Sequence, residues 1–174
     1  MPPADVKRYA AAVVTVSDKG FSGEREDRSG AVVREALEAA GITVTRTEIV
    51  PDEREVLANF LEELCREGVD LIVTTGGTGL SPRDVTPEAT LSVIEKEVPG
   101  MAEAMRAESL KVTPHAMISR AVCGLRGHTL IINLPGSPKG ARECLEVVMP
   151  AVPHALEVAA GNASECAPGS PPAC

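Results

Sequence analysis

Hydrophobic residues recur along the chain in two patterns that predict alternating strands and helices. Apolar or alternating runs rich in β-branched residues predict strands over Ala10–Val16, Ile42–Val50, Asp70–Thr74 and Thr129–Leu134. Apolar positions three and four residues apart predict helices over Gly30–Ala40, Glu53–Glu67, Thr86–Glu97, Met101–Lys111, Ala141–Met149 and Ala151–Ala160. Pro99-Gly100 is expected to break the chain between two helices, Pro114–Val122 to be helical or irregular, and Gly124–Gly127 to form a turn.

This alternation predicts an α/β fold with a parallel sheet covered by helices on both faces. In such sheets ligands bind at the carboxyl ends of the strands. The polar, glycine and proline residues of the chain concentrate in the segments that follow the predicted strands: Ser17–Ser29, Val50–Asp52, Thr75–Asp84 and Pro135–Lys139. We therefore expect these segments to form one cleft.

Composition and charge exclude several classes of function. The net charge of −8 and the aromatic content of 2% disfavour nucleic acids and anionic membranes as partners. No apolar run reaches the ~18 residues of a transmembrane helix, and the N-terminal residues show no clear signal peptide, so a cytoplasmic protein is expected. The five cysteines contain no C-x-x-C pair, and Cys65 and Cys144 are expected to be small core residues.

The stretch TTGGTGLSPRDVTPEAT (Thr74–Thr90) joins a predicted strand to a predicted helix. Thr86 is expected to be the N-cap of that helix and Pro87 its first residue. The glycines allow the backbone to approach an anion closely, and the threonine hydroxyls and free amides supply donors. The stretch is neither a Walker loop nor a dinucleotide fingerprint, so it is either an anion-binding loop or only a tight turn.

Two aspartates near these segments have a structural and a functional interpretation. Asp84 either pairs with Arg83 or orders the turn, or else binds Mg²⁺ beside bound phosphates. Asp52 either caps the next helix, since Glu55 stands three residues later, or shares a divalent cation with Asp84. On sequence alone both alternatives stay open for each residue.

Cationic residues could complete an anion site. Lys139 follows Ser137 and Pro138 at a predicted helix start, where a cation opposes the helix dipole unless a phosphate binds there; otherwise it is a solvated surface lysine. The loop that contains Ser17, Asp18, Lys19, Arg25 and Arg28 is either plain surface or a flap over a nucleotide.

Four segments together resemble molybdopterin adenylyltransferases, the bacterial enzymes and the G domains of gephyrin and its plant counterpart. These segments are VPDE (Val50–Glu53), TTGGTGLSPRDVTPEAT, ESLKVTPHAMISRAVCGLRG (Glu108–Gly127) and IINLPGSPKGARECLE (Ile131–Glu146). The resemblance extends from about Ala10 to Gly161.

The resemblance implies a three-layer α/β/α sandwich with a mostly parallel sheet, the molybdopterin-binding domain fold, and a homotrimer. It implies adenylylation of molybdopterin with ATP and Mg²⁺, which releases pyrophosphate before a molybdenum-insertion protein acts. By residue-for-residue match, Asp52 and Asp84 are the expected catalytic and Mg²⁺-binding residues. The expected substrate- and nucleotide-binding residues are Ser17, Asp18, Thr75, Gly76, Gly77, Thr78, Gly79, Ser109, Ser119, Pro135, Gly136, Ser137 and Lys139.

Two hypotheses of function follow. The first is the adenylyltransferase, which the presence of both carboxylates favours. The second is a module of the same fold that binds molybdopterin or scaffolds a partner without catalysis. In either case one domain is expected over residues 1–162, followed by a disordered tail over residues 163–174 that is rich in Ser, Pro, Gly and Ala.

Overall fold

A computed structural model describes residues 8–162 of the chain. Its centre is a six-stranded sheet in the order β2-β1-β3-β6-β5-β4. The strands are β1 (Ala10–Val16), β2 (Thr43–Val50), β3 (Leu71–Thr75), β4 (Lys96–Glu97), β5 (Cys123–Arg126) and β6 (Thr129–Leu134). β2, β1, β3 and β6 run parallel to one another. β5 pairs antiparallel with β6, and β4 pairs antiparallel with β5. The predicted α/β fold with a mostly parallel sheet is therefore confirmed.

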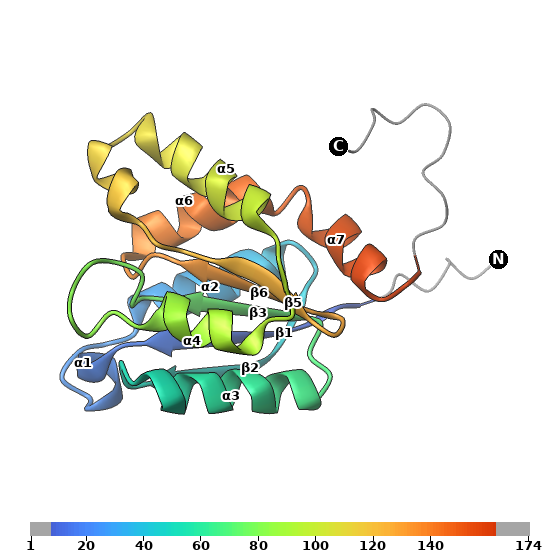
Figure 1. The fold of residues 1–174 in the computed structure, drawn as a ribbon, viewed down its shortest axis with the longest axis horizontal. Coiled ribbons are helices and arrows are strands. Elements are labelled where there is room, and N and C mark those ends of the chain that lie inside the picture. The colour runs from blue at the N-terminus through green and yellow to red at the C-terminus, as the bar shows by residue number, and fades with distance from the viewer. Residues whose placement is uncertain (1–7, 163–174) are drawn as a thin grey trace.

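Helices cover both faces of the sheet and make three layers (Figure 1). They are α1 (Asp18–Phe21), α2 (Arg28–Ala39), α3 (Arg54–Arg66), α4 (Thr86–Val93), α5 (Pro99–Leu110), the 3₁₀-helix η1 (Pro114–Ile118), α6 (Pro138–Val148) and α7 (Val152–Ala159). α2, α5, α6 and α7 pack on one face, and α3 and α4 on the other.

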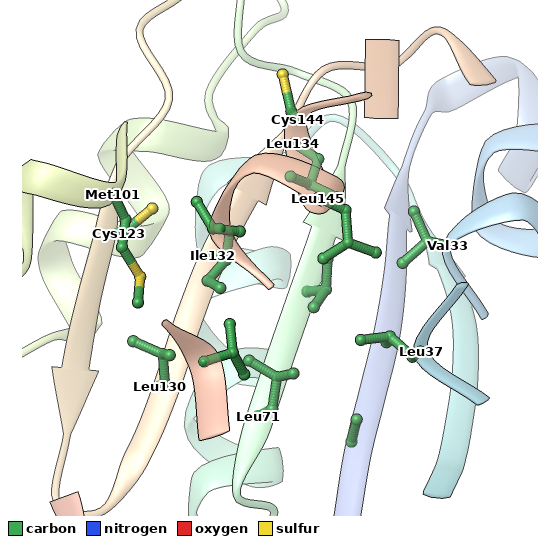
Figure 2. Close-up of a cluster of buried hydrophobic side chains, with 14 of the residues drawn as sticks. Val33, Leu37, Leu71, Met101, Cys123, Leu130, Ile132, Leu134, Cys144 and Leu145 are labelled. Carbon is green, nitrogen blue, oxygen red and sulfur yellow. The ribbon is translucent and has the colours of Figure 1, made fainter. Parts of the chain in front are cut away.

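Alternate residues of each central strand enter two separate cores. In β6, Leu130 and Ile132 face the core beneath α5 and α6 (Figure 2), while Ile131 faces the core beneath α3. All three are fully buried. Burial of such a side chain is worth about 1.5–3 kcal/mol, which explains why the strands read as continuous apolar runs. The buried hydrophobic residues of both cores are aliphatic or sulfur-containing.

The region from α4 to β6 differs from the prediction. The helix expected over Thr86–Glu97 ends at Val93, because Ile94 is extended and the chain then pairs with β5. The turn expected at Gly124–Gly127 is largely strand β5. A Cβ on Gly124 would lie 2.7 Å from the carbonyl oxygen of Lys96, so the glycine permits close strand pairing where the sequence suggested a turn.

Two smaller features also differ, whereas residues 114–122 are as expected. Pro99 begins α5 and does not simply break the chain, and residues 18–21 form the short helix α1 within an expected loop. Residues 114–122 are a 3₁₀ turn followed by irregular chain. Across residues 8–162, none of the helices combines the length and apolar character needed to cross a membrane. The predicted disordered tail, residues 163–174, lies outside the described residues.

Candidate active site

The four parallel strands end at one edge of the sheet, where the segments that follow them enclose a pocket of about 830 Å³. We call it the carboxylate pocket, because Asp52 and Asp84 both line it. Its remaining walls come from residues 15–17, 20, 24–29, 75–77 and 136–138. The four segments that were expected to form one cleft therefore meet in this pocket.

A second pocket, of about 320 Å³, adjoins the first at Ser137, which lines both. We call it the apolar pocket, because Ala102 and Met105 of α5 and Ile118 of η1 form much of its wall. Thr78, Gly79, Ser109, Ser119 and Pro135 also line this pocket. Most of the predicted binding residues are thus divided between two adjoining pockets.

The segment between β3 and α4, residues 76–85, separates these pockets, and we call it the glycine loop. Gly76 and Gly77 adopt φ angles of 99° and 66°, which side-chain-bearing residues rarely adopt. A Cβ on Gly76 would lie 2.4 Å from the carbonyl oxygen of Val16. Glycine is therefore required here both by backbone conformation and by the close approach of β1.

Each carbonyl oxygen from Gly76 to Gly79 accepts a hydrogen bond. Thr86 donates its Oγ1 to the Gly76 oxygen at 2.9 Å and its backbone N–H to the Gly77 oxygen at 3.1 Å. Arg120 donates its backbone N–H to the Thr78 oxygen at 2.9 Å and its Nε to the Gly79 oxygen at 2.8 Å. The acceptors of the loop are thereby occupied by the protein.

The amides of residues 76–79 in the same loop are mostly unoccupied. Gly76 donates to the carbonyl of Leu134 at 3.1 Å, but within residues 8–162 the N–H groups of Gly77, Thr78 and Gly79 have no protein acceptor. A run of unpaired N–H groups on a positive-φ backbone forms a concavity that binds anions. Of the two interpretations of the glycine stretch, the geometry favours the anion-binding loop.

Asp52 is tied to Asp18 by two reciprocal hydrogen bonds. The Asp18 N–H donates to Asp52 Oδ2 at 2.8 Å, and the Asp52 N–H donates to Asp18 Oδ1 at 2.9 Å. The predicted capping role is wrong, because α3 begins at Arg54 and its N-cap, Glu53, makes no side-chain cap. Burial raises the pKa of Asp52, and the negative charges of Asp18 and Asp84 raise it further, although the Asp18 N–H lowers it. A cation at this carboxylate would therefore be stabilising.

Asp84 orders the turn within the glycine loop. Its Oδ2 accepts the N–H of Ser81 at 3.0 Å. Arg83 instead pairs with Asp18, donating Nε and Nη2 to its two carboxylate oxygens at 3.0 Å each. The Arg83 hydrogen bonds lower the pKa of Asp18 and hold it ionised. The alternative in which Asp84 pairs with Arg83 is thus wrong, and the alternative in which Asp84 orders the turn is confirmed.

Some of the polar groups of the apolar pocket lie on α5 and on the segment that follows η1. Arg106 donates Nη1 to the Ala121 carbonyl at 3.1 Å and so anchors the backbone next to Ser119. Ser109 Oγ lies 3.6 Å from Cys144 Sγ. Burial raises the pKa of the Cys144 thiol, which keeps it neutral, as expected of a small core residue.

Two predicted site residues do not line either pocket. Lys139 has a 79% exposed side chain whose Nζ lies 3.8 Å from the Glu143 carboxylate. Asp18 is hydrogen-bonded to Asp52, which lines the carboxylate pocket, and is ion-paired with Arg83. The helix start predicted at Ser137 and Pro138 is confirmed, because Ser137 is the N-cap of α6 and its Oγ accepts the N–H of Gly140 at 3.1 Å.

Sequence reasoning missed the residues that hold the glycine loop. Thr86 was expected to be the N-cap of α4, but it is the first residue of that helix. The side chain of Thr86 is fully buried and donates its hydroxyl to the Gly76 carbonyl of the loop. Arg120 was not singled out at all. Its position next to Ser119 within the resembling segment was the available signal, since no charge pattern or helical spacing marks it.

The parallel sheet, with an anion-binding glycine loop at its carboxyl edge and helices on both faces, defines a ligand-binding protein of the α/β class. Residues 12–154 match the family model described as "Probable molybdopterin binding domain", which places the site described above inside the matched region. The chain belongs to this family.

Individual relatives match over most of their length. A molybdopterin adenylyltransferase of Helicobacter pylori (strain J99) is 46% identical over 153 residues, which cover 86% of this chain and 87% of the relative. The molybdopterin adenylyltransferase of Escherichia coli K12 is 39% identical over 171 residues, covering 90% of this chain and 88% of the relative. The crystal structure of the molybdopterin biosynthesis enzyme MoaB from Thermus thermophilus is 53% identical and superposes with a TM-score of 0.83, covering 88% of this chain and 97% of that one.

Proposed function

We propose that this protein is a molybdopterin adenylyltransferase of molybdenum cofactor biosynthesis. It transfers the AMP group of ATP to the terminal phosphate of molybdopterin and releases pyrophosphate. The observation that carries the proposal is the glycine loop, whose unpaired amides lie between the carboxylate pocket and the apolar pocket. Relatives with this activity in their names match most of the chain.

The chemistry of the two pockets supports one assignment of the substrates. The triphosphate of ATP suits the carboxylate pocket, where Arg25 and Arg28 contribute cationic side chains. The pterin suits the apolar pocket, because Met105 and Ile118 offer apolar contact and Ser119 a hydrogen-bonding group. In this arrangement both reacting phosphates reach the glycine loop.

The residues of the carboxylate pocket fit a Mg²⁺ ion that is shared with substrate. Within residues 8–162, no group of three or more His, Cys, Asp or Glu residues could hold a metal ion alone. Mg²⁺ is commonly held by one or two carboxylates together with substrate phosphates, and Asp52 and Asp84 supply such a pair. The raised pKa of Asp52 also favours a neighbouring cation. When bound, Mg²⁺ would offset negative charge on the phosphates of ATP.

The transfer needs alignment and charge neutralisation more than proton transfer. An oxygen of the pterin phosphate attacks the α-phosphorus of ATP and forms a new P–O bond. The bond from the α-phosphorus to the α,β-bridging oxygen breaks, and its electron pair leaves with pyrophosphate. The attacking phosphate oxygen is already anionic, so it needs no general base. The amides of Gly77, Thr78 and Gly79 align the phosphate oxygens and stabilise their charge.

The proposal is tested by mixing the purified protein with molybdopterin, ATP and Mg²⁺ and by measuring adenylylated molybdopterin. Asp84→Asn keeps an oxygen that can accept the Ser81 N–H, so the loop should stay folded. We expect it to retain pterin binding but to lose turnover by about 10²–10³-fold, as for removal of one group that stabilises transition-state charge.

Arg34→Ala is the control, because the exposed Arg34 of α2 lines neither pocket; it should leave turnover unchanged. A wild-type protein that forms no product would refute the proposal. Tight ATP-independent binding of molybdopterin, unaffected by Asp84→Asn, would instead identify a binding or scaffolding module.

The proposal extends to assembly and location. We infer a cytoplasmic homotrimer that passes adenylylated molybdopterin to a molybdenum-insertion protein. Light scattering of the purified protein measures the number of subunits, and a monomer at assay concentration would contradict the trimer.

A further inference from the structure

Arg120 holds the glycine loop from a position outside both pockets. It follows η1, and besides its bonds to Thr78 and Gly79 it donates Nη2 to the carbonyl oxygen of Asp84 at 3.0 Å. One residue therefore binds three carbonyl groups spread over seven positions of a segment without helix or strand. Arg120 lines neither the carboxylate pocket nor the apolar pocket. Any effect of Arg120 on a ligand in these pockets must therefore pass through the loop that it binds.

Besides the three carbonyls, Arg120 has a fourth partner, the carboxylate of Glu88. Glu88 lies in the first turn of α4, and its Oε1 accepts Nη1 of Arg120. Its Oε2 is buried and has no hydrogen-bond partner among the described residues. Burial opposes ionisation of Glu88, but the hydrogen bond of Arg120, a hydrogen bond from the Glu88 backbone and the charges of Arg120 and Arg54 together lower the pKa of Glu88. The ion pair orients the guanidinium plane and ties α4 to the loop.

The orientation of the loop peptides decides what a phosphate meets. A peptide whose carbonyl is engaged by Arg120 directs that oxygen, with its partial negative charge, toward the guanidinium. If the loop rotated, carbonyl oxygens would face the phosphates and repel them, and the Asp84 carboxylate would move. The planar fork of an arginine directs its donors to separate carbonyls at fixed angles, whereas a lysine concentrates its three donors on one rotatable ammonium.

We propose that Arg120, oriented by Glu88, is a positioning residue for adenylyl transfer. It keeps the carbonyls of Gly79 and Asp84 directed away from substrate, so that the loop amides and the Asp84 carboxylate face the reacting phosphates. The role in turnover rests on the proposed function, whereas the effect on loop conformation and anion binding does not.

The test compares Arg120→Ala and Arg120→Lys with matched variants of Arg126. Arg126 has the same 34% side-chain exposure, donates Nη1 to the Val93 carbonyl at 2.8 Å and lies 3.8 Å from Glu62, but it does not contact the loop. The Arg126 variants therefore remove an arginine with the same kinds of partner, a backbone carbonyl and a glutamate, at a position away from the site.

Three measurements distinguish positioning from general stability. NMR should show faster hydrogen exchange at the hydrogen-bonded amides of Gly76 and Thr86 in both Arg120 variants, with the rest of the sheet unchanged. Calorimetry with inorganic pyrophosphate should show affinity lowered by about 10–100-fold, the range for residues that orient site groups. Added guanidinium should restore pyrophosphate binding to Arg120→Ala, because it can refill the vacated space, and the Arg126 variants should show none of these effects.

The outcomes separate this inference from the proposed function. A wild-type protein without adenylyl transfer would refute the proposed function, while exchange and pyrophosphate binding would still report on positioning. If Arg120→Ala does not fold, Arg120→Lys decides, since it keeps the cation beside Glu88. Unchanged loop exchange and unchanged pyrophosphate affinity in Arg120→Lys would overturn the positioning role.

Discussion

Replacement of Gly76 by alanine tests whether the glycine loop depends on a close approach to β1. Gly76 has a φ angle of 99°, and a Cβ placed there would lie 2.4 Å from the carbonyl oxygen of Val16. That oxygen belongs to the backbone of a central strand, so it cannot move aside as a flexible side chain could. The substitution therefore adds a steric clash to the strain of a left-handed alanine.

The two contributions can be given separate magnitudes. An L-residue in the left-handed region costs about 1–2 kcal/mol. An inserted methyl group that forces the backbone to shift costs a further ~1–3 kcal/mol. We therefore expect Gly76→Ala to lower the free energy of unfolding by about 2–5 kcal/mol.

Gly41→Ala is the matched control for this prediction. Gly41 has a φ angle of 81° at the end of α2, and a Cβ there would meet nothing within 4 Å. It should show only the conformational cost of about 1–2 kcal/mol. Because the chain contains no Trp, urea unfolding is followed by far-ultraviolet circular dichroism. Equal destabilisation by the two substitutions would refute the close-approach argument.

Two further predictions concern a half-buried carboxylate and a buried amide. Burial and the charges of Asp18 and Asp84 raise the pKa of Asp52 in the folded state. Between the unfolded and the folded pKa, the folded protein therefore binds more protons than the unfolded chain. Ionisation of Asp52 consequently lowers stability as the pH rises through this range. Asp52→Asn should raise the urea midpoint at neutral but not at strongly acidic pH; an unchanged midpoint at neutral pH would contradict the assignment. Asn133 is fully buried and accepts the Val122 N–H at 3.1 Å. Asn133→Leu should cost about 3 kcal/mol in urea unfolding by leaving buried groups unpaired, and a cost below about 1 kcal/mol would contradict this.

The sequence predicted the site where local chemistry was sufficient and failed where a distant partner decided. Asp52 stands at a capping position by spacing, yet its carboxylate binds the N–H of Asp18, 34 residues away in the chain. Arg83 is adjacent to Asp84 but pairs with Asp18, 65 positions distant. A local sequence pattern indicates only partners that are near in the chain. The parallel sheet brings the ends of separate strands to one edge, where residues distant in the chain become hydrogen-bond partners.

Strands β4 and β5 were missed for a related reason. Lys96–Glu97 is an exposed strand of two residues, and Cys123–Arg126 contains a glycine, so neither has the apolar run that marked β1, β3 and β6. Their conformation comes from pairing with the neighbouring strand, which no local pattern encodes.

The sequence by itself determined the layered α/β architecture, because burial on both faces requires continuous apolar strands and amphipathic helices. It also determined the glycine loop, since few residues other than glycine adopt its φ angles at Gly76 and Gly77. Only the tertiary structure decided how that loop is held: Thr86 and Arg120 occupy the carbonyls of residues 76–79, whereas the amides of Gly77, Thr78 and Gly79, which line the two pockets, have no acceptor among the described residues. The physical reason is that a hydrogen bond depends on where two groups lie in space, and the fold alone brings Arg120 to the loop.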